Sequence, residues 1–114
     1  MRMQKNLLTM ARSVVKLERE GSLNHLIKNK KNKDFVILYH SLWDEYSERI
    51  LGEIDMWKDR SDKKDEVVHL INSWDLPHSF VAFSVTSVPT LVRSVRGRIL
   101  VENYLPNIFR FFSS

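Results

Sequence analysis

The stretch FVILYHSLWDEYSERI, residues 35–50, joins an unbroken apolar run to the start of an amphipathic helix. The run at 35–39 is too apolar to face water on either side, which is typical of a central strand covered by helices on both faces. From residue 44 to residue 59, apolar residues recur at helical spacing with charged residues between them. That pattern predicts an amphipathic helix of about four turns directly after the strand.

The sequence before this stretch predicts one more strand and one more helix. Apolar and polar residues alternate across 13–17, as in a short strand. The dipeptide at 21–22, Gly-Ser, then opens a helical stretch in which Leu23, Leu26 and Ile27 recur on one face. We expect that face to be buried.

Beyond the central helix, residues 66–71 are rich in valine, leucine and isoleucine and predict a second central strand. Asp75 is a suitable N-cap for a short helix that runs to Phe83, because aspartate side chains accept hydrogen bonds from free helix amides. Pro77 falls in the first turn of that helix, where proline is tolerated.

The last third predicts a hairpin and a terminal helix. Residues 90–95 and 99–102 are strand-like and flank a tight turn at 96–97, Arg-Gly. The apolar segment 104–112 predicts a short helix. The order is β, α, β, α, β, α, β, β, α, which predicts an α/β fold with a central mixed sheet of four to five strands flanked by helices. Right-handed crossovers leave few ways to assemble it.

Two separated motifs resemble the thioredoxin family. YHSLW at 39–43 resembles the strand end and tryptophan that precede the family's Cys-Gly-Pro-Cys, which is replaced here by DEYS at 44–47. SVPTL at 87–91 resembles the family's Val-Pro-Thr signature, and Gly97 follows at the family's usual interval. The resemblance covers residues 12–112 and implies a thioredoxin-like fold.

The resemblance also carries expectations about single positions. It implies a cis peptide bond between Val88 and Pro89, in a loop whose backbone binds extended peptides in the family. A buried acid of the family's central strand corresponds to Leu38, and a lysine of the neighbouring strand corresponds to His69. The family's proton-transfer groups are thus replaced as well as its cysteines.

The complete lack of cysteine decides the chemistry. None of the 114 residues carries a thiol, which excludes disulfide exchange, thiolate catalysis and cysteine-ligated zinc within this chain. We therefore expect a redox-inactive thioredoxin-like domain that is not an enzyme, takes no cofactor and acts as a protein-interaction or structural module. Small chains of this sort occur in complexes and in phage or other accessory genomes.

The expected contact surface is the former active-site turn together with the proline loop. Exposed aromatic residues at such a turn are typical of binding hot spots, and Trp74 is a further aromatic candidate. Tyr46 is equally compatible with the start of the buried helix stripe. The predicted interaction surface, for a protein or peptide partner, comprises Trp43, Asp44, Glu45, Tyr46, Ser47, Val88 and Pro89.

An enzyme and a metal site are weaker alternatives. Ser47 could act as a nucleophile with His40 or His78 as base and Asp44 as orienting group. Asp44 is more simply explained as a helix cap and Ser47 as a residue of the first turn. The chain's four histidines are scattered without ligand spacing, so we expect no metal site.

The basic N-terminal third supports an alternative function. Residues 1–33 hold nine Lys and Arg against two Glu, whereas residues 34–114 hold nine against twelve acids. Nucleic acid or another polyanion could bind there, although no aromatic residue is interleaved for base stacking. The candidate patch comprises Lys28, Lys30, Lys31 and Lys33, with Arg12 and Lys16 beside it.

Domain limits and location are further expectations. Residues 1–11 predict a flexible basic leader, and residues 12–114 a single domain. No apolar run is long enough to span a membrane, so we expect a soluble, cytoplasmic protein, with organellar targeting by the leader as the alternative. The aromatic residues Phe109, Phe111 and Phe112 are expected in the core or in an oligomer contact.

Overall fold

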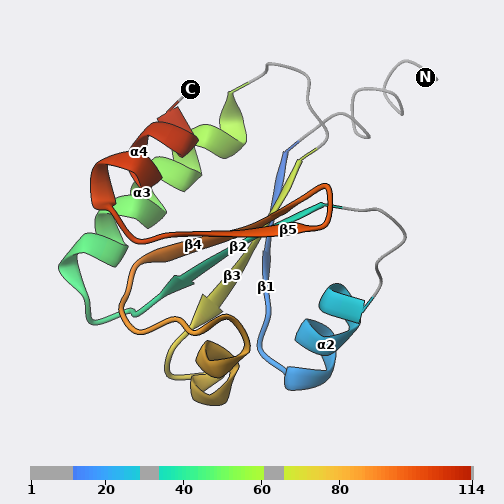
Figure 1. The fold of residues 1–114 in the computed structure, drawn as a ribbon. Helices are drawn as coiled ribbons and strands as arrows, with labels where there is room; N and C mark the ends of the chain where they lie inside the picture. The colour runs from blue at the N-terminus through green and yellow to red at the C-terminus, as the bar shows by residue number, and fades with distance from the viewer. Residues whose placement is uncertain (1–11, 29–33, 61–65, 114) are drawn as a thin grey trace, which may run out of the picture.

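The computed structural model describes residues 12–28, 34–60 and 66–113 (Figure 1). The expected leader at 1–11 lies outside these residues. Nine elements follow in the predicted order: β1 (Ser13–Lys16), α2 (Glu20–Lys28), β2 (Phe35–His40), α3 (Glu45–Asp59), β3 (Val67–Asn72), η1 (Pro77–Phe83), β4 (Thr90–Val95), β5 (Arg98–Glu102) and α4 (Leu105–Ser113).

The strands form one mixed sheet in the order β1-β3-β2-β4-β5. Strands β1, β3 and β2 run parallel, with Val14 and Val36 both opposite Val68. Strand β4 lies antiparallel to β2, with Leu38 opposite Leu91, and β5 completes the hairpin at the edge. The predicted α/β class and mixed sheet are therefore confirmed.

Alternating side chains of β2 divide the core into two layers. Ile37 and Tyr39 are fully buried in a cluster with Leu23 of α2 on one face of the sheet. Leu38 is fully buried in the opposite cluster with Ile54 of α3 and residues of α4. Figure 1 shows α3 and α4 side by side on their face of the sheet. An unbroken apolar strand is needed because both of its faces are covered.

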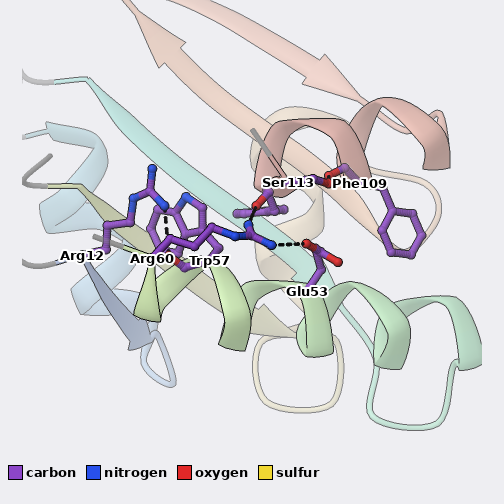
Figure 2. A network of polar contacts seen from close by, with 7 residues as sticks. Arg12, Glu53, Trp57, Arg60, Phe109 and Ser113 are labelled. Carbon is purple, nitrogen blue, oxygen red and sulfur yellow. Dashed lines mark hydrogen bonds and ion pairs between the residues drawn. The ribbon is translucent and has the colours of Figure 1, made fainter. Parts of the chain in front are cut away.

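Charged side chains connect α3 to its neighbours (Figure 2). Arg60 donates to a carboxylate oxygen of Glu53 at 2.9 Å and to the main-chain oxygen of Phe112 in α4. Arg12 donates to the main-chain oxygen of Trp57 at 2.9 Å and pairs with Glu66 at 3.2 Å. These contacts fix both the start of β1 and the end of α4 against α3.

The short helix after β3 differs from the prediction. Residues Pro77–Phe83 form a 3₁₀ helix with Leu76 at its N-cap, and no side chain caps it. The Asp75 cap prediction was therefore wrong, because the helix begins one residue too late for Asp75 to be the cap. Asp75 instead closes a turn, in which its main-chain N–H donates to the main-chain oxygen of Asn72 at 3.0 Å.

The C-terminal aromatic residues pack inside the chain. Phe112 is fully buried, and its ring meets Trp57 edge to face with centroids 5.8 Å apart. Phe109 and Phe111 are half-buried against the same cluster. The core role expected for this segment is thus confirmed. None of the helices within the described ranges is long and apolar enough to cross a membrane.

Candidate functional site

Three loops meet at one end of the sheet. Strands β2 and β3 run parallel, and His40 lies opposite Asn72 at their ends. Strand β4 is antiparallel and begins there, with Thr90 opposite Tyr39. The main-chain N–H of Ser73 donates to the main-chain oxygen of His40 at 2.8 Å. The turns after β2 and β3 and the loop before β4 are therefore neighbours.

The turn after β2 ends on a capped helix. Asp44 is the N-cap of α3, and its carboxylate accepts from the main-chain N–H of Ser47 at 2.7 Å. This confirms the predicted cap, which satisfies one of the free amides of the first turn. Glu45 and Glu48 follow in that turn, where their negative charges complement the helix dipole.

Ser47 lies beneath the turn and is no surface residue. Its side chain is fully buried, and its hydroxyl oxygen accepts from the main-chain N–H of Ser41 at 3.2 Å. A nucleophile must be reached by its substrate. The Ser47 nucleophile and the placement of Ser47 on the interaction surface are both wrong, because the hydroxyl supports the turn from inside.

Two tryptophans from different loops meet above this turn. Trp43 follows β2 and is 74% exposed, and Trp74 follows β3 and is 73% exposed. Their rings are edge to face, with centroids 5.3 Å apart and an interplanar angle of 79°. Tyr46, the third aromatic side chain here, is 49% exposed, so it does not begin the buried stripe of α3.

A groove of about 430 Å³ opens beside the tryptophan pair. We call it the tryptophan groove. Its volume is in the range of roughly 300 to 1,000 Å³ typical of ligand sites. Leu51, Ile54 and Leu70 contribute apolar wall. The other lining residues are Val14, Lys16, Leu17, Glu18, His40, Leu42, Trp43, Asp55, Asn72, Trp74 and Asp75.

His40 is the buried polar residue of the tryptophan groove. Its Nδ1 atom is buried and has no hydrogen-bond partner among the residues that the structure describes. Burial lowers the pKa of the His40 imidazole, with a smaller lowering by Lys16 and an opposing influence of Asp75. The ring is therefore neutral near pH 7. A base role toward Ser47 fails because the Ser47 side chain is fully buried and no substrate can reach it.

The proline loop contributes backbone more than side chain. The Val88–Pro89 peptide bond is cis. Pro89 is buried and Val88 is half-buried against the core cluster that contains Leu17. Pro89 is thus another member of the predicted surface whose side chain is covered.

The basic patch is only partly described. Lys28 is exposed in the last turn of α2, while Lys30, Lys31 and Lys33 lie outside the described residues. Arg12 was expected beside them, but its side chain is buried against Trp57, with the guanidinium carbon 4.7 Å from the ring centroid. Arg12 is therefore unavailable to a polyanion.

Other candidate positions have structural roles. His69 lies half-buried on β3, and its Nδ1 is 3.3 Å from the main-chain oxygen of Val36. Burial lowers the pKa of His69, and that hydrogen bond opposes the shift. Within the described ranges, no group of three or more histidine or carboxylate side chains could hold a metal ion.

A larger cavity of about 730 Å³ lies at the opposite end of the sheet. It is lined in part by Asp34 and Glu66, which directly adjoin segments that the structure does not describe. His25, His69 and Arg93 also line it. The cavity brings together none of the predicted interaction-surface residues.

Sequence reasoning undervalued Trp74 and missed the parts played by Leu42 and His40. A signal for Trp74 was present, because it follows a strand predicted to lie parallel to the strand before Trp43. Parallel neighbours end at the same edge of a sheet, so the residues after them meet. The sequence holds no such signal for the burial of His40, because a histidine at the end of a strand can be either buried or exposed to solvent.

Comparisons with known proteins complete the description of the site. No protein-family model and no curated protein matches this sequence. Solved structures do match over most of the chain. A reduced Schistosoma mansoni thioredoxin pre-protein has a TM-score of 0.67 at 17% identity and covers 89% of this chain and 96% of its own.

Two further thioredoxins give the same result. Thioredoxin O2 from Arabidopsis thaliana has a TM-score of 0.66 at 18% identity, covering 88% of this chain and 91% of its own. Mitochondrial thioredoxin 3 from Saccharomyces cerevisiae has a TM-score of 0.66 at 16% identity, covering 88% and 93%. Likeness at this level of identity establishes the fold and confirms the prediction of a thioredoxin-like fold.

Proposed function

We propose that this chain, a thioredoxin fold without cysteine, is a redox-inactive module that binds a protein or peptide partner. Its binding surface is the aromatic turn surface, which we define as Leu42, Trp43, Tyr46 and Trp74. The observation that supports the proposal is the exposed tryptophan pair at the end of the sheet where the three loops meet.

The exposure of these side chains is the first argument. Leu42 is 62% exposed, and the two tryptophans are exposed by nearly three quarters. Scattered apolar residues are common on protein surfaces, but clusters of large ones mark interaction sites. Tryptophan and tyrosine also dominate the small set of residues that contribute most binding energy. A contact role accounts for all four side chains.

The loss of thiol chemistry is the second argument. Asp44 stands at the start of the tetrapeptide that replaces the catalytic one, and it now caps α3. Ser47 stands at its end and is fully buried. Neither position presents a reactive group, so the turn keeps its shape and its aromatic neighbours while electron transfer through it is absent.

The proline loop belongs to the proposed surface through its backbone. It precedes Thr90, which lies opposite Tyr39 at the end of β2. An extended peptide that passes along this end of the sheet contacts main-chain groups near Val88 and the side chains of the aromatic turn surface. Binding of this kind combines backbone hydrogen bonds with side-chain pockets.

Peptide selection tests the proposal. The protein is immobilised and used to select binders from a random peptide library, and binding constants are then measured for Trp43→Ala and Trp74→Ala. Removing one hot-spot aromatic costs about 2 kcal/mol or more, so we expect affinity to fall by a factor of about 30 or more. The matched control is Ile99→Ala, an exposed apolar residue on the edge strand β5.

The contrary result is equally clear. Selected peptides that bind both tryptophan variants as tightly as the parent protein, or that lose binding only with Ile99→Ala, would show that the aromatic turn surface is not the contact site. Retention of nucleic acid that depends on Lys28 would favour the polyanion alternative. That alternative has weaker support, because Arg12 is buried in the core.

A further inference from the structure

We infer that the tryptophan groove receives the side chain of an arginine or lysine from the bound partner. This inference rests on the proposed function, because it names the chemistry that the same surface selects. Three observations carry it: the aromatic mouth, the surplus of carboxylates and the polar atom left without a partner. Each favours a long side chain that ends in a cation.

The mouth of the groove is suited to a cation. Trp43 and Trp74 both line it and are both largely exposed. Because their rings meet edge to face, the pair does not stack its two faces against each other. Indole faces carry negative electrostatic potential, and tryptophan is the strongest side-chain partner for a guanidinium or ammonium group.

The walls of the groove are suited to an aliphatic stem. Leu51, Ile54 and Leu70 line it between the helix α3 and the sheet. Arginine and lysine bury their methylene groups along apolar surface while the charged head stays in a polar setting. A leucine or phenylalanine could use the same walls but would leave the charged rim without a partner.

The charges around the groove are mostly negative. The charged lining residues are one cation, Lys16, and three carboxylates, Glu18, Asp55 and Asp75, so the lining carries a net charge of −2. Glu45, in the first turn of α3, is exposed but pairs with Arg49 at 2.9 Å, so it adds no net charge to this rim. Such a rim attracts a cationic ligand and disfavours an acidic peptide or a nucleic acid.

His40 adds a polar requirement at the groove. Its imidazole is neutral near pH 7 because burial lowers its pKa, and its Nδ1 has no partner among the described residues. Buried polar atoms in folded proteins are nearly always hydrogen-bonded. A neutral imidazole has one accepting and one donating nitrogen, so a ligand rich in N–H donors meets this requirement when the proton of His40 lies on Nε2.

Short peptides test the inference directly. Tripeptides that are acetylated and amidated, with Arg, Lys, Leu or Glu between two glycines, are titrated into the protein and followed by NMR at the two exposed indole N–H groups. The Arg and Lys peptides are expected to shift both indole signals. The Glu peptide is expected to leave them unchanged, and the Leu peptide to bind at least about tenfold more weakly, the factor that corresponds to loss of one good cation–π contact.

Charge variants give the second measurement. Asp55→Asn and Asp75→Asn together should weaken Arg-peptide binding several-fold and reduce its salt dependence, while Asp59→Asn, an exposed acid of α3 that does not line the groove, should leave both unchanged. Urea unfolding of each variant separates a binding defect from a folding defect. The inference is overturned if the Leu or Glu peptide binds as tightly as the Arg peptide. It is also overturned if the double variant binds the Arg peptide as tightly as the parent protein does.

The outcome can be separated from that of the proposed function. If library-selected peptides depend on Trp43 and Trp74 but lack arginine and lysine, the contact surface stands and the basic-ligand inference fails. If they carry basic residues yet ignore both tryptophans, the proposed function itself fails.

Discussion

The guanidinium of Arg12 lies 4.7 Å from the ring centroid of Trp57 and also donates to that residue's main-chain oxygen at 2.9 Å. One cation thus holds the start of β1 against the last turn of α3. It also pairs with Glu66, which directly precedes β3. Three segments that are distant in sequence depend on this one side chain.

Arg12→Met should therefore destabilise the fold. The change keeps an apolar stem but removes the donor that pairs with the Glu66 carboxylate and leaves the Trp57 main-chain oxygen with the Arg60 N–H as donor. Hydrogen bonds to charged groups contribute about 1.5 to 3 kcal/mol, and we expect a loss of that size in the free energy of unfolding measured in urea. Arg98→Met on the exposed end of β5 should cost less than about 0.5 kcal/mol. Equal losses in the two variants would contradict the buried role of Arg12.

Asp44→Ala should weaken the start of α3. It removes the carboxylate that accepts from the Ser47 N–H, and loss of such a cap costs about 1 kcal/mol in unfolding free energy. Asp44→Asn keeps the accepting oxygen and should retain most of the stability. An asparagine variant as unstable as the alanine variant would show that charge, and not capping geometry, explains the residue.

Phe112→Ala should be among the most damaging changes in the C-terminal helix. The side chain is fully buried between α4 and α3, and its removal leaves a cavity that costs about 3 to 5 kcal/mol. Tyr104→Ala, at a position 60% exposed, serves as the matched aromatic control and should cost less than about 1 kcal/mol. A small effect of Phe112→Ala would place that ring outside the core.

Stability should fall as the solution becomes mildly acidic. Burial lowers the pKa of both His40 and His69 below their ordinary value of 6.5. As pH falls through about 6.5, the unfolded chain binds protons that the folded chain does not, so the free energy of the unfolded state falls relative to that of the folded state. The free energy of unfolding is therefore highest above that pH. It decreases as the pH falls below about 6.5, until the pH reaches the pKa values of the two histidines in the folded state.

Unfolding titrations at several pH values measure this effect. His69→Val and His40→Asn should each reduce the slope of unfolding free energy against pH between roughly pH 5 and 7, because each removes one group whose proton uptake differs between states. His78→Asn, at an exposed position, is the matched control for the loss of a histidine side chain. A slope that survives in the double variant of His40 and His69 would assign the effect to other groups.

The fold could be predicted from sequence because its signals are local and consistent. The apolar run before Asp44 requires a strand covered on both faces, and the helical pattern after it, the valine-rich strand at 66–71 and the turn before Gly97 all agree with one sheet order. The Asp75 cap prediction failed because the helix begins after Leu76, whose side chain cannot cap it, so the residue types near its start do not mark the boundary. The main-chain hydrogen bond from the Ser79 N–H to the Leu76 oxygen shows where the 3₁₀ helix begins.

The site was harder to predict because exposure depends on distant partners. Arg12 lies in a strongly basic segment and looked like surface, yet its partner Glu66 is far along the chain. Ser47 follows an exposed residue, but its own side chain is buried. It is held there by two hydrogen bonds, in which its hydroxyl oxygen accepts from the Ser41 N–H and its own N–H donates to the Asp44 carboxylate. Trp43 and Trp74 become neighbours only when β2 and β3 align.

Chemical-shift mapping of a selected peptide on nitrogen-15-labelled protein tests the central claim most directly. A peptide partner that binds the aromatic turn surface should produce its largest shifts at the indole N–H groups of Trp43 and Trp74 and at the main-chain amide of Tyr46. The β5 residues Ile99 to Val101 should change least. Largest shifts on β5 or near Lys28, with both indole signals unmoved, would contradict the account.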